Sequence, residues 1–313
     1  MGKEIGFIGL GKMGKAMTRR LLEHKWRVIG YDVLPEAVAA AKAQGITGRS
    51  SLKELVSKLQ PPRIIWMMLP AGDPVDEVIN GLVQIGLNRD DIIIDGGNSN
   101  YHDTIRRAAA LEARGVYYLD VGVSGGSVGA KPGFSLTVGG SKRAYEKIEP
   151  ILKSLASSEG HYPKEPNPEG FAYIGPSGSG HFVKMVHNAI LYSMMQGIGE
   201  GFELLANGPY KELDLKTIAR VWKHGSVIRS FLIELAEQAF EKDPRLVHVA
   251  GYVEDSGEGR WALQEAINFN IPFDTTARAL FARMSSREDE SFAAKVVAIL
   301  RNEFGGHKIR RKE

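Results

Sequence analysis

An alternation of short apolar runs with helical patterns, over residues 1 to about 175, constrains the fold most strongly. The apolar runs are typical of buried strands, and helical patterns lie between them. These helical patterns are KMGKAMTRRLLEHK, SLKELVSKL, DPVDEVINGLV, HDTIRRAAALEARG and SKRAYEKIEPILKSLA. The strand-like runs are EIGFIGL, WRVIGYD, RIIWMMLP, DIIIDGG, VYYLDVGVSGG and FSLTVGG. Strands that alternate with helices favour a parallel sheet with crossover helices, so this part of the chain is predicted to be an α/β domain.

A second part begins at about residue 178, where strand-like runs nearly disappear and long helical periodicities take over. Segments rich in Pro, Gly and Ser, PKEPNPEG and GPSGSG, separate the two parts. Such a composition is common in linkers between domains. The sequence therefore predicts an α/β domain over residues 1–176 and an all-α domain over residues 177–313.

A glycine motif follows the first predicted strand. Gly9, Gly11 and Gly14 have the spacing G-x-G-x-x-G and open a helical pattern. In Rossmann-type folds these glycines permit a tight turn, the approach of a pyrophosphate and close packing of helix on strand. The motif therefore predicts a dinucleotide cofactor.

Asp32 ends the second predicted strand and indicates which dinucleotide binds. A carboxylate at this place accepts a hydrogen bond from the ribose 2′-hydroxyl and repels a 2′-phosphate, so we expect NAD rather than NADP. The alternative is an aspartate that only caps a turn. The residues expected to line the cofactor are Gly9, Leu10, Gly11, Lys12, Met13, Gly14, Asp32, Leu69, Pro70 and Asn98.

A row of polar side chains interrupts the apolar segment GHFVKMVHNAILYSMMQ, residues 180–196. On a helix, Lys184, His187 and Asn188 project from one face, and Leu191 completes the row. A lysine that is desolvated among apolar neighbours can act as a general base, because burial favours its neutral form. The alternatives are a lysine whose ammonium group reaches solvent and a histidine that merely satisfies its hydrogen bonds in the core.

Two glycine-rich segments, DGGNSN at 95–100 and VSGGSVGAKPG at 123–133, follow predicted strands. Ligands of open parallel sheets bind outside the carboxyl ends of the strands. Glycine amides there can face an anion, while Asn98 and Ser124 offer neutral hydrogen bonds. Either segment alone could be a tight turn. Together with the polar helix they predict a three-part site for an anionic substrate.

Composition excludes several classes of function. The chain has no cysteine, which excludes disulfides, thiolate metal sites and a cysteine nucleophile. Its longest apolar run, IIWMML, is far shorter than the ~20 residues of a membrane span. With a net charge of +3 and no basic helix, the chain offers no nucleic-acid surface. We expect a cytoplasmic protein without a metal centre.

Four longer segments resemble the 6-phosphogluconate dehydrogenases, specifically their short, NAD-preferring bacterial form. These segments are DGGNSNYHDTIRR, GVSGGSVGAKPGFSLTVGG, GSGHFVKMVHNAI and RNEFGGHK. The wider β-hydroxyacid dehydrogenase family shares the nucleotide fold, the SGG turn and the helical lysine, whereas the paired His-Asn and the tail motif resemble the phosphogluconate branch. The resemblance implies NAD-dependent oxidative decarboxylation of 6-phosphogluconate to ribulose 5-phosphate and CO2, a step of the pentose phosphate pathway.

The resemblance also implies roles for individual residues. Lys184 would act as base and then as acid, with His187 and Asn188 beside it in the catalytic group. Substrate binding is expected from Asn98, Ser124, Gly125, Gly126, Tyr192, Arg260, Arg283, Arg301 and His307. Arg301 and His307 would reach a neighbouring subunit's site, which implies a homo-oligomer, a dimer or a tetramer. Any one of the arginines could instead form a surface ion pair.

Leu191 departs from the family's pattern, in which the position three residues after Asn188 is ordinarily a glutamate that protonates the enediol. Leucine cannot donate a proton, and neither Tyr192 nor Glu200 and Glu203 has the right spacing to replace it. Slower protonation through water, a substrate altered near carbon 1 and an engineered variant remain open. So do two other functions: an NAD-dependent dehydrogenase of another anionic hydroxy acid (a sulfonated or non-phosphorylated sugar acid, or a β-hydroxyacid) and a catalytically impaired variant.

Overall fold

The computed structural model describes residues 2–126, 131–157 and 169–310. Residues 127–130 of the second glycine-rich segment, residues 163–168 of the predicted linker and residues 311–313 of the tail lie outside this part. The chain forms two compact units, an N-terminal unit over Met1–His187 and a C-terminal unit over Asn188–Glu313. The domain boundary near residue 176 stays a prediction.

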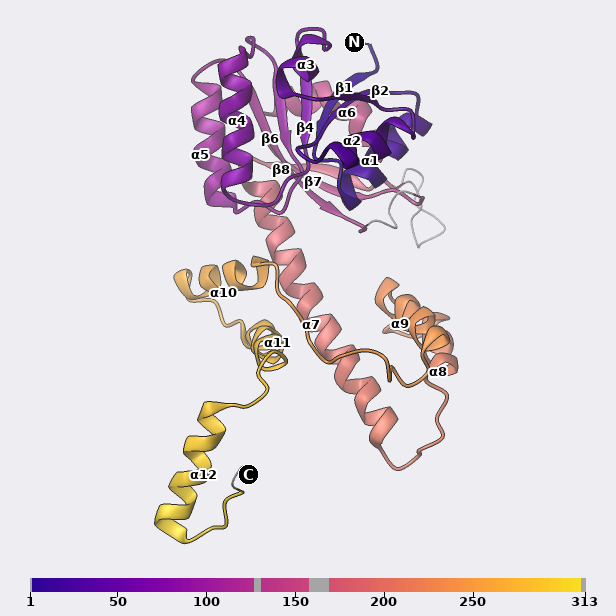
Figure 1. The fold of residues 1–313 in the computed structure, drawn as a ribbon, viewed down its shortest axis with the longest axis vertical. Coiled ribbons are helices and arrows are strands. Elements are labelled where there is room, and N and C mark those ends of the chain that lie inside the picture. Colours follow the sequence, from indigo (N-terminus) through magenta and orange to yellow (C-terminus); the bar gives the residue numbers. More distant parts are fainter. Residues whose placement is uncertain (1, 127–130, 158–168, 311–313) are drawn as a thin grey trace. The chain divides into compact units, whose positions relative to one another are not determined.

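In the described part of the chain, a sheet of eight strands is the centre of the N-terminal unit (Figure 1), in the order β3-β2-β1-β4-β5-β6-β7-β8. Its strands are β1 (Glu4–Ile8), β2 (Arg27–Tyr31), β3 (Thr47–Arg49), β4 (Ile64–Met67), β5 (Ile92–Asp95), β6 (Tyr117–Ser124), β7 (Ser135–Gly140) and β8 (Phe171–Gly175). Neighbouring strands are parallel except β6 and β7. From β1 the sheet extends through β2 and β3 in one direction. The chain then returns to the other side of β1, where β4 pairs with it, and the sheet extends in the opposite direction.

Among the residues that the structure describes, six helices cover the two faces of the sheet. Both faces are covered, and strands such as Ile92–Asp95 therefore bury every residue. The helices are α1 (Lys12–Glu23), α2 (Pro35–Lys42), α3 (Leu52–Ser57), α4 (Asp73–Ile85), α5 (Tyr101–Glu112) and α6 (Lys142–Leu155). One core joins α1, α2 and α6 to the sheet around Phe7 and Trp66. The other joins α3, α4 and α5 to it around Ile65 and Tyr118. This doubly covered sheet confirms the predicted α/β fold class.

Three local features differ from the sequence prediction. Strands β6 and β7 are antiparallel, whereas the sequence predicts a parallel sheet with crossover helices. Only residues 125–134 connect them, and a parallel crossover needs about a dozen residues or more. The prediction also omits β3 and β8, and it omits helix α2. Strand β3 is three residues long at the sheet edge, and α2 buries only Val38 and Ala41, so their sequence patterns are weak.

The C-terminal unit is helical, as predicted. Helix α7 (Ser179–Asn207) begins in the N-terminal unit, and the helices that follow are α8 (Leu215–Lys223), α9 (Phe231–Lys242), α10 (Glu258–Asn268), α11 (Asp274–Ser285) and α12 (Phe292–Gly305). One small core gathers around Phe202 and Phe240, and another around Tyr192 and Leu280. In the described part of the chain, no helix combines the length and apolarity of a membrane span.

Arg20 ties the helix after the glycine motif to the rest of the N-terminal unit. It is 8% exposed, and its guanidinium donates to the carbonyl oxygens of Ser154, Lys131 and Ala156, each at 2.9 Å. We predict that Arg20→Met lowers the free energy of unfolding by about 3 kcal/mol, because three carbonyl groups lose a charged donor. Urea unfolding followed by tryptophan fluorescence measures this loss.

Arg19→Ala is the matched control. Arg19 pairs with Glu23 one turn along the same helix, and its side chain is 63% exposed. Exposed pairs of this kind contribute about 0.5 kcal/mol or less. Equal unfolding midpoints for the two variants would contradict the anchoring role of Arg20.

Candidate functional site

The connections that carry the glycine motif and Asp32 leave the sheet at one edge. Strand register aligns Ile8 with both Tyr31 and Met67, and Met67 with Asp95. Because these strands are parallel, the segments that begin at Gly9, Asp32 and Gly96 all start at the carboxyl edge. In an open sheet of this kind, that edge is where ligands bind.

The glycine motif has the close contacts that a dinucleotide loop requires. A Cβ atom on Gly14 would lie 2.0 Å from the carbonyl oxygen of Gly9, so only glycine lets α1 approach β1 so closely. Gly9 has a φ of +90°, which a side chain would strain. A Cβ atom on Gly11 would meet nothing within 4 Å. The open space at Gly11 fits the approach of a pyrophosphate to the first turn of α1.

Asp32 holds the loop of the glycine motif in place. Its Oδ2 atom accepts from the Leu10 amide at 2.6 Å, and its Oδ1 atom accepts from the Leu34 amide at 2.9 Å. The carboxylate therefore caps a turn, and its remaining lone pairs can still accept a ribose hydroxyl. The ribose role stays a prediction. Of the other expected cofactor residues, Leu10 is buried, Met13 and Leu69 are half-buried, and Lys12 and Pro70 are exposed.

The end of β6 lies against the first turns of α7. The Oγ atom of Ser124 is 3.2 Å from His187 Nε2. A Cβ atom on Gly122 would lie 2.5 Å from the Cβ of Lys184, so glycine at that position lets the lysine pack directly on the strand. Lys184 is half-buried. The structure thus brings the predicted base beside the predicted SGG turn.

Gly125 and Gly126 continue from Ser124 with φ values of +131° and +59°. Both are exposed, so their amides are open to a ligand. Asn98 is also exposed, at the carboxyl edge after β5. Two neighbouring strands thus present the predicted anion-binding residues at their ends.

Two buried groups that sequence reasoning missed fix the start of α7. Asp120 is fully buried, and its two carboxylate oxygens accept from the amides of Gly178 and His181, each at 2.9 Å. The His181 ring lies 2.7 Å from Thr104 Oγ1 through Nδ1 and 3.1 Å from the Asp95 carbonyl oxygen through Nε2. A carboxylate inside the apolar run VYYLDVGV is the signal that points to Asp120, but the sequence does not identify its partner.

In the C-terminal unit, Asn188 and Tyr192 meet the start of α10. Asn188 is 8% exposed, and its Nδ2 atom donates to Glu258 Oε1 at 3.1 Å. The Tyr192 ring packs on Gly259, where a Cβ atom would come within 2.7 Å of it. The guanidinium carbon of Arg283 lies 3.6 Å from the centroid of the same ring. Sequence reasoning missed Glu258, because its burial depends on the packing of α10 on α7.

The predicted phosphate ligands have different surroundings. Arg260 forms a two-point ion pair with Asp255 at 2.8 and 3.0 Å, and Arg287 contacts the same carboxylate at 3.0 Å. The hydrogen bond from Arg260, followed by that from Arg287, lowers the pKa of Asp255 to about 2. Arg283 donates to the carbonyl oxygen of Glu254 at 2.9 Å. The ion pair considered as the alternative for Arg260 is therefore present, and its phosphate role stays a prediction.

Arg301 and His307 lie at the end of α12, and both are exposed. Gly306 ends the helix with a φ of +62°, and the His307 carbonyl oxygen accepts from Asn302 Nδ2 at 2.8 Å. Their role in a neighbouring subunit stays a prediction. Among the described residues, no cluster of His, Asp and Glu could hold a metal ion.

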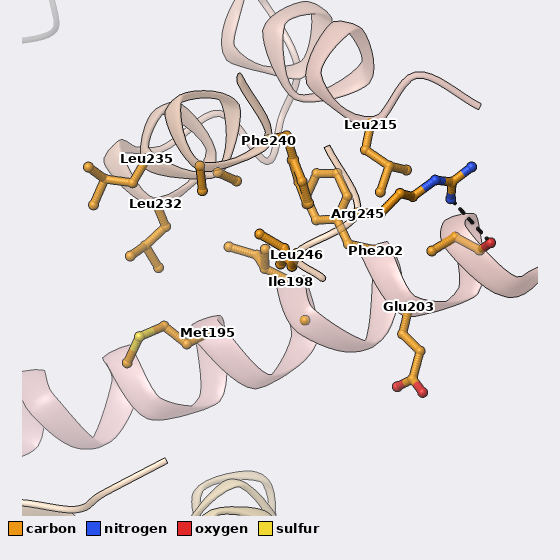
Figure 2. Close-up of a pocket in the computed structure, with 14 residues that line it drawn as sticks. Met195, Ile198, Phe202, Glu203, Leu215, Leu232, Leu235, Phe240, Arg245 and Leu246 are labelled. Carbon is orange, nitrogen blue, oxygen red and sulfur yellow. Dashed lines mark hydrogen bonds between the residues drawn. The ribbon is translucent and has the colours of Figure 1, made fainter. Parts of the chain in front are cut away.

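An apolar cavity of about 550 Å³ lies elsewhere in the C-terminal unit, between α7 and the α8–α9 pair (Figure 2). Ile198, Phe202 and Phe240 are among its lining residues. Arg245 at its rim donates to the carbonyl oxygen of Ala206 at 3.4 Å. None of the predicted site residues lines this cavity, so it is separate from the candidate site.

The open space at Gly11 gives a direct test of cofactor binding. Gly11 has a φ of −65°, which alanine adopts readily, so Gly11→Ala is expected to leave the melting temperature unchanged. The added methyl group fills the space that a pyrophosphate needs. We predict at least a roughly tenfold weaker binding of NAD, measured by calorimetric titration, because a well-placed ligand contact contributes about 1.4 kcal/mol or more.

Gly197→Ala is the control for that variant. Gly197 lies on α7, and a Cβ atom there would also meet nothing within 4 Å. Unchanged NAD affinity in Gly197→Ala together with a loss in Gly11→Ala supports the predicted cofactor position. Equal affinity in both variants would rule it out.

Comparisons with known proteins match both parts of the chain. A sequence profile described as the NAD binding domain of 6-phosphogluconate dehydrogenase matches residues 4–169, and one for the C-terminal domain of 6-phosphogluconate dehydrogenase matches residues 180–312. The putative 6-phosphogluconate dehydrogenase YqeC of Bacillus subtilis is 44% identical over 99% of this chain and 100% of its own length. The NAD(+)-dependent, decarboxylating 6-phosphogluconate dehydrogenase of Haloferax volcanii is 42% identical over 99% of both chains.

Solved structures show the same fold. The 6-phosphogluconate dehydrogenase of Plasmodium falciparum superposes with a TM-score of 0.81 and 31% identity, covering 99% of this chain and 66% of its own. The 3-hydroxyisobutyrate dehydrogenase of Mycobacterium tuberculosis has a TM-score of 0.67, covers 96% of this chain and 100% of its own, and at 21% identity shows the fold alone. With both domain profiles matched and full-length relatives above 40% identity, the chain belongs to the 6-phosphogluconate dehydrogenase family.

Proposed function

We propose that the protein catalyses the NAD-dependent oxidative decarboxylation of 6-phosphogluconate to ribulose 5-phosphate and CO2. One observation carries the proposal: Lys184 is half-buried against β6, at the polar carboxyl edge of a sheet whose glycine loop fits a dinucleotide. The relative from Haloferax volcanii, which carries this activity in its name, aligns with the chain from end to end.

The first step oxidises the hydroxyl group at carbon 3 of the substrate. NAD, when bound, supplies the hydride acceptor. In this proposal the neutral amine of Lys184 takes the hydroxyl proton as general base. His187, 3.2 Å from Ser124 through its Nε2 atom, binds a substrate hydroxyl or orients the lysine.

The second step releases CO2 from the resulting β-keto acid. Negative charge then develops on the oxygen at carbon 3, where protonated Lys184 stabilises it and returns the proton. Ser124, with the amides of Gly125 and Gly126, holds the carboxylate side of the substrate. Asn98 and Asn188 bind hydroxyl groups near the reacting carbons.

The phosphate end of the substrate requires cations. Arginine recognises phosphate with two parallel hydrogen bonds, and we assign this role to Arg283 and Arg260, with Tyr192 beside them. Asp255 neutralises part of the charge of Arg260, so the proposal leaves Arg283 as the stronger ligand. Arg301 and His307 complete the phosphate site of a neighbouring subunit.

A homo-oligomer is part of the proposal. Residues 292–300 of α12 are all exposed, and they include Phe292, Val297 and Leu300 at 78, 57 and 56% exposure. Exposed apolar surface on this scale marks a contact with another protein. We infer that a second copy covers this helix, and that the enzyme works in the cytoplasm, where phosphorylated sugar acids are metabolised.

Replacement of the base tests the proposal. We predict that Lys184→Ala lowers kcat for NADH formation from 6-phosphogluconate by a factor of about 10³, because a general base contributes roughly 10²–10⁴-fold. NAD binding should be unchanged. Lys153→Ala is the control, since Lys153 pairs with Glu149 on the surface of α6 and should leave kcat unaffected.

A comparison of substrates distinguishes this activity from that of a dehydrogenase for another hydroxy acid. The wild-type enzyme should reduce NAD with 6-phosphogluconate and not with 3-hydroxyisobutyrate. Turnover of the small acid without turnover of the phosphorylated sugar acid would select a different hydroxyacid dehydrogenase. Normal turnover by Lys184→Ala would remove the lysine from the mechanism.

A further inference from the structure

Loss of CO2 leaves an enediol, and its conversion to a ketone needs a proton at the carbon that carried the carboxylate. Lys184 can take the proton of the neighbouring hydroxyl, but a separate acid must supply the carbon-bound proton. The polar row on α7 ends in Leu191, which has no proton to give. The assignment of this acid rests on the proposed function, because only the decarboxylation of 6-phosphogluconate forms the enediol.

Glu258 is a buried carboxyl group beside the proposed substrate ligand Asn188. It is the first residue of α10 and is 1% exposed. Its Oε1 atom accepts from Asn188 Nδ2 at 3.1 Å. Its Oε2 atom is buried and has no hydrogen-bond partner among the described residues. One carboxyl oxygen is thus committed to the asparagine, and the other is left for a ligand.

The Oε2 atom of Glu258, unpaired among the described residues, has a cost in free energy. A buried polar atom without a partner costs about 1–3 kcal/mol, and a bound ligand that pairs with Oε2 would recover this free energy. Asn188 donates a hydrogen bond to Oε1 whether the carboxyl group is protonated or ionised, which leaves Oε2 as the atom that gains or loses the proton. After the proton leaves, the N-terminus of α10 favours the negative charge.

Other acidic groups nearby are already engaged or are distant along α7. The Tyr192 hydroxyl lies 3.5 Å from Ser256 Oγ and accepts from the Ser256 amide at 3.4 Å. Glu200 accepts a hydrogen bond from Gln196 at 2.8 Å and is exposed. Glu258 therefore combines burial, contact with Asn188 and an uncommitted oxygen.

We propose that Glu258 is the acid that protonates the enediol. The O–H bond at Oε2 breaks as the new C–H bond forms at carbon 1 of ribulose 5-phosphate. At the same time Lys184 takes the proton of the hydroxyl at carbon 2, where the carbonyl group forms. One proton is given and one is taken, and solvent exchange returns the proton from the lysine to the carboxylate before the next turnover.

Hydrogen exchange at carbon 1 isolates this step from hydride transfer. The enzyme is incubated with ribulose 5-phosphate and NADH in D2O without bicarbonate, and deuterium at carbon 1 is followed by NMR. We predict that Glu258→Gln slows this exchange by a factor of about 100 or more, as expected for loss of a general acid. The substituted amide keeps an acceptor for Asn188, so the single-turnover rate of NADH formation should change by less than about threefold.

Two further variants sharpen the experiment. Glu200→Gln, which removes an exposed carboxylate from α7, should exchange carbon 1 at the wild-type rate. Adding Leu191→Glu to Glu258→Gln places a carboxyl group on the polar row and should restore exchange. Restoration supports an acid role, because a defect of packing alone would persist.

Two results would overturn the proposal. Wild-type exchange in Glu258→Gln would exclude this carboxyl group as the acid. A parallel loss of exchange and of single-turnover NADH formation would show that Glu258 only positions Asn188. Absence of NADH formation by the wild-type enzyme with 6-phosphogluconate would contradict the proposed function itself. This measurement on the wild-type enzyme therefore separates a failure of the proposed function from a failure of the role of Glu258.

Discussion

The bond between Asp120 and the start of α7 determines where the proposed catalytic residues lie. Both oxygens of this fully buried carboxylate accept from backbone amides, one at Gly178 just before the helix and one at His181 in its first turn. Buried charges are stable only when such partners satisfy them. Lys184 and His187 follow within two turns on the same helix. The buried carboxylate of Asp120 on β6 therefore sets the position of both side chains on α7.

The sequence predicts the parts of this protein that follow regular patterns. Strand and helix periodicity predict the doubly covered sheet and the helical second unit, and the spacing of Gly9, Gly11 and Gly14 predicts the dinucleotide loop. The antiparallel pair β6–β7 and the short strands β3 and β8 escape prediction, because their pairing depends on loop length and edge position rather than on periodicity. The buried carboxylates Asp120 and Glu258 escape for a related reason, since their partners are distant in sequence.

Two carboxylates position polar and cationic side chains in the C-terminal unit. Asp255 lies just before α10, and Glu258 is the first residue of that helix. Asp255 holds Arg260 and Arg287, while Glu258 contacts Asn188. The first arrangement orders Arg260, which the proposal assigns to phosphate binding. The second leaves a buried carboxyl oxygen beside Asn188, and we propose that this oxygen supplies the proton that Leu191 cannot. Leu191 therefore does not by itself argue against a complete reaction.

The central claim is that this chain both oxidises and decarboxylates 6-phosphogluconate with NAD. Its most direct test is the stoichiometry of the reaction: a limiting amount of 6-phosphogluconate is consumed by the wild-type enzyme, and NADH, CO2 and ribulose 5-phosphate are quantified. The account predicts equal amounts of all three products. NADH without CO2, or no NADH at all, would contradict it.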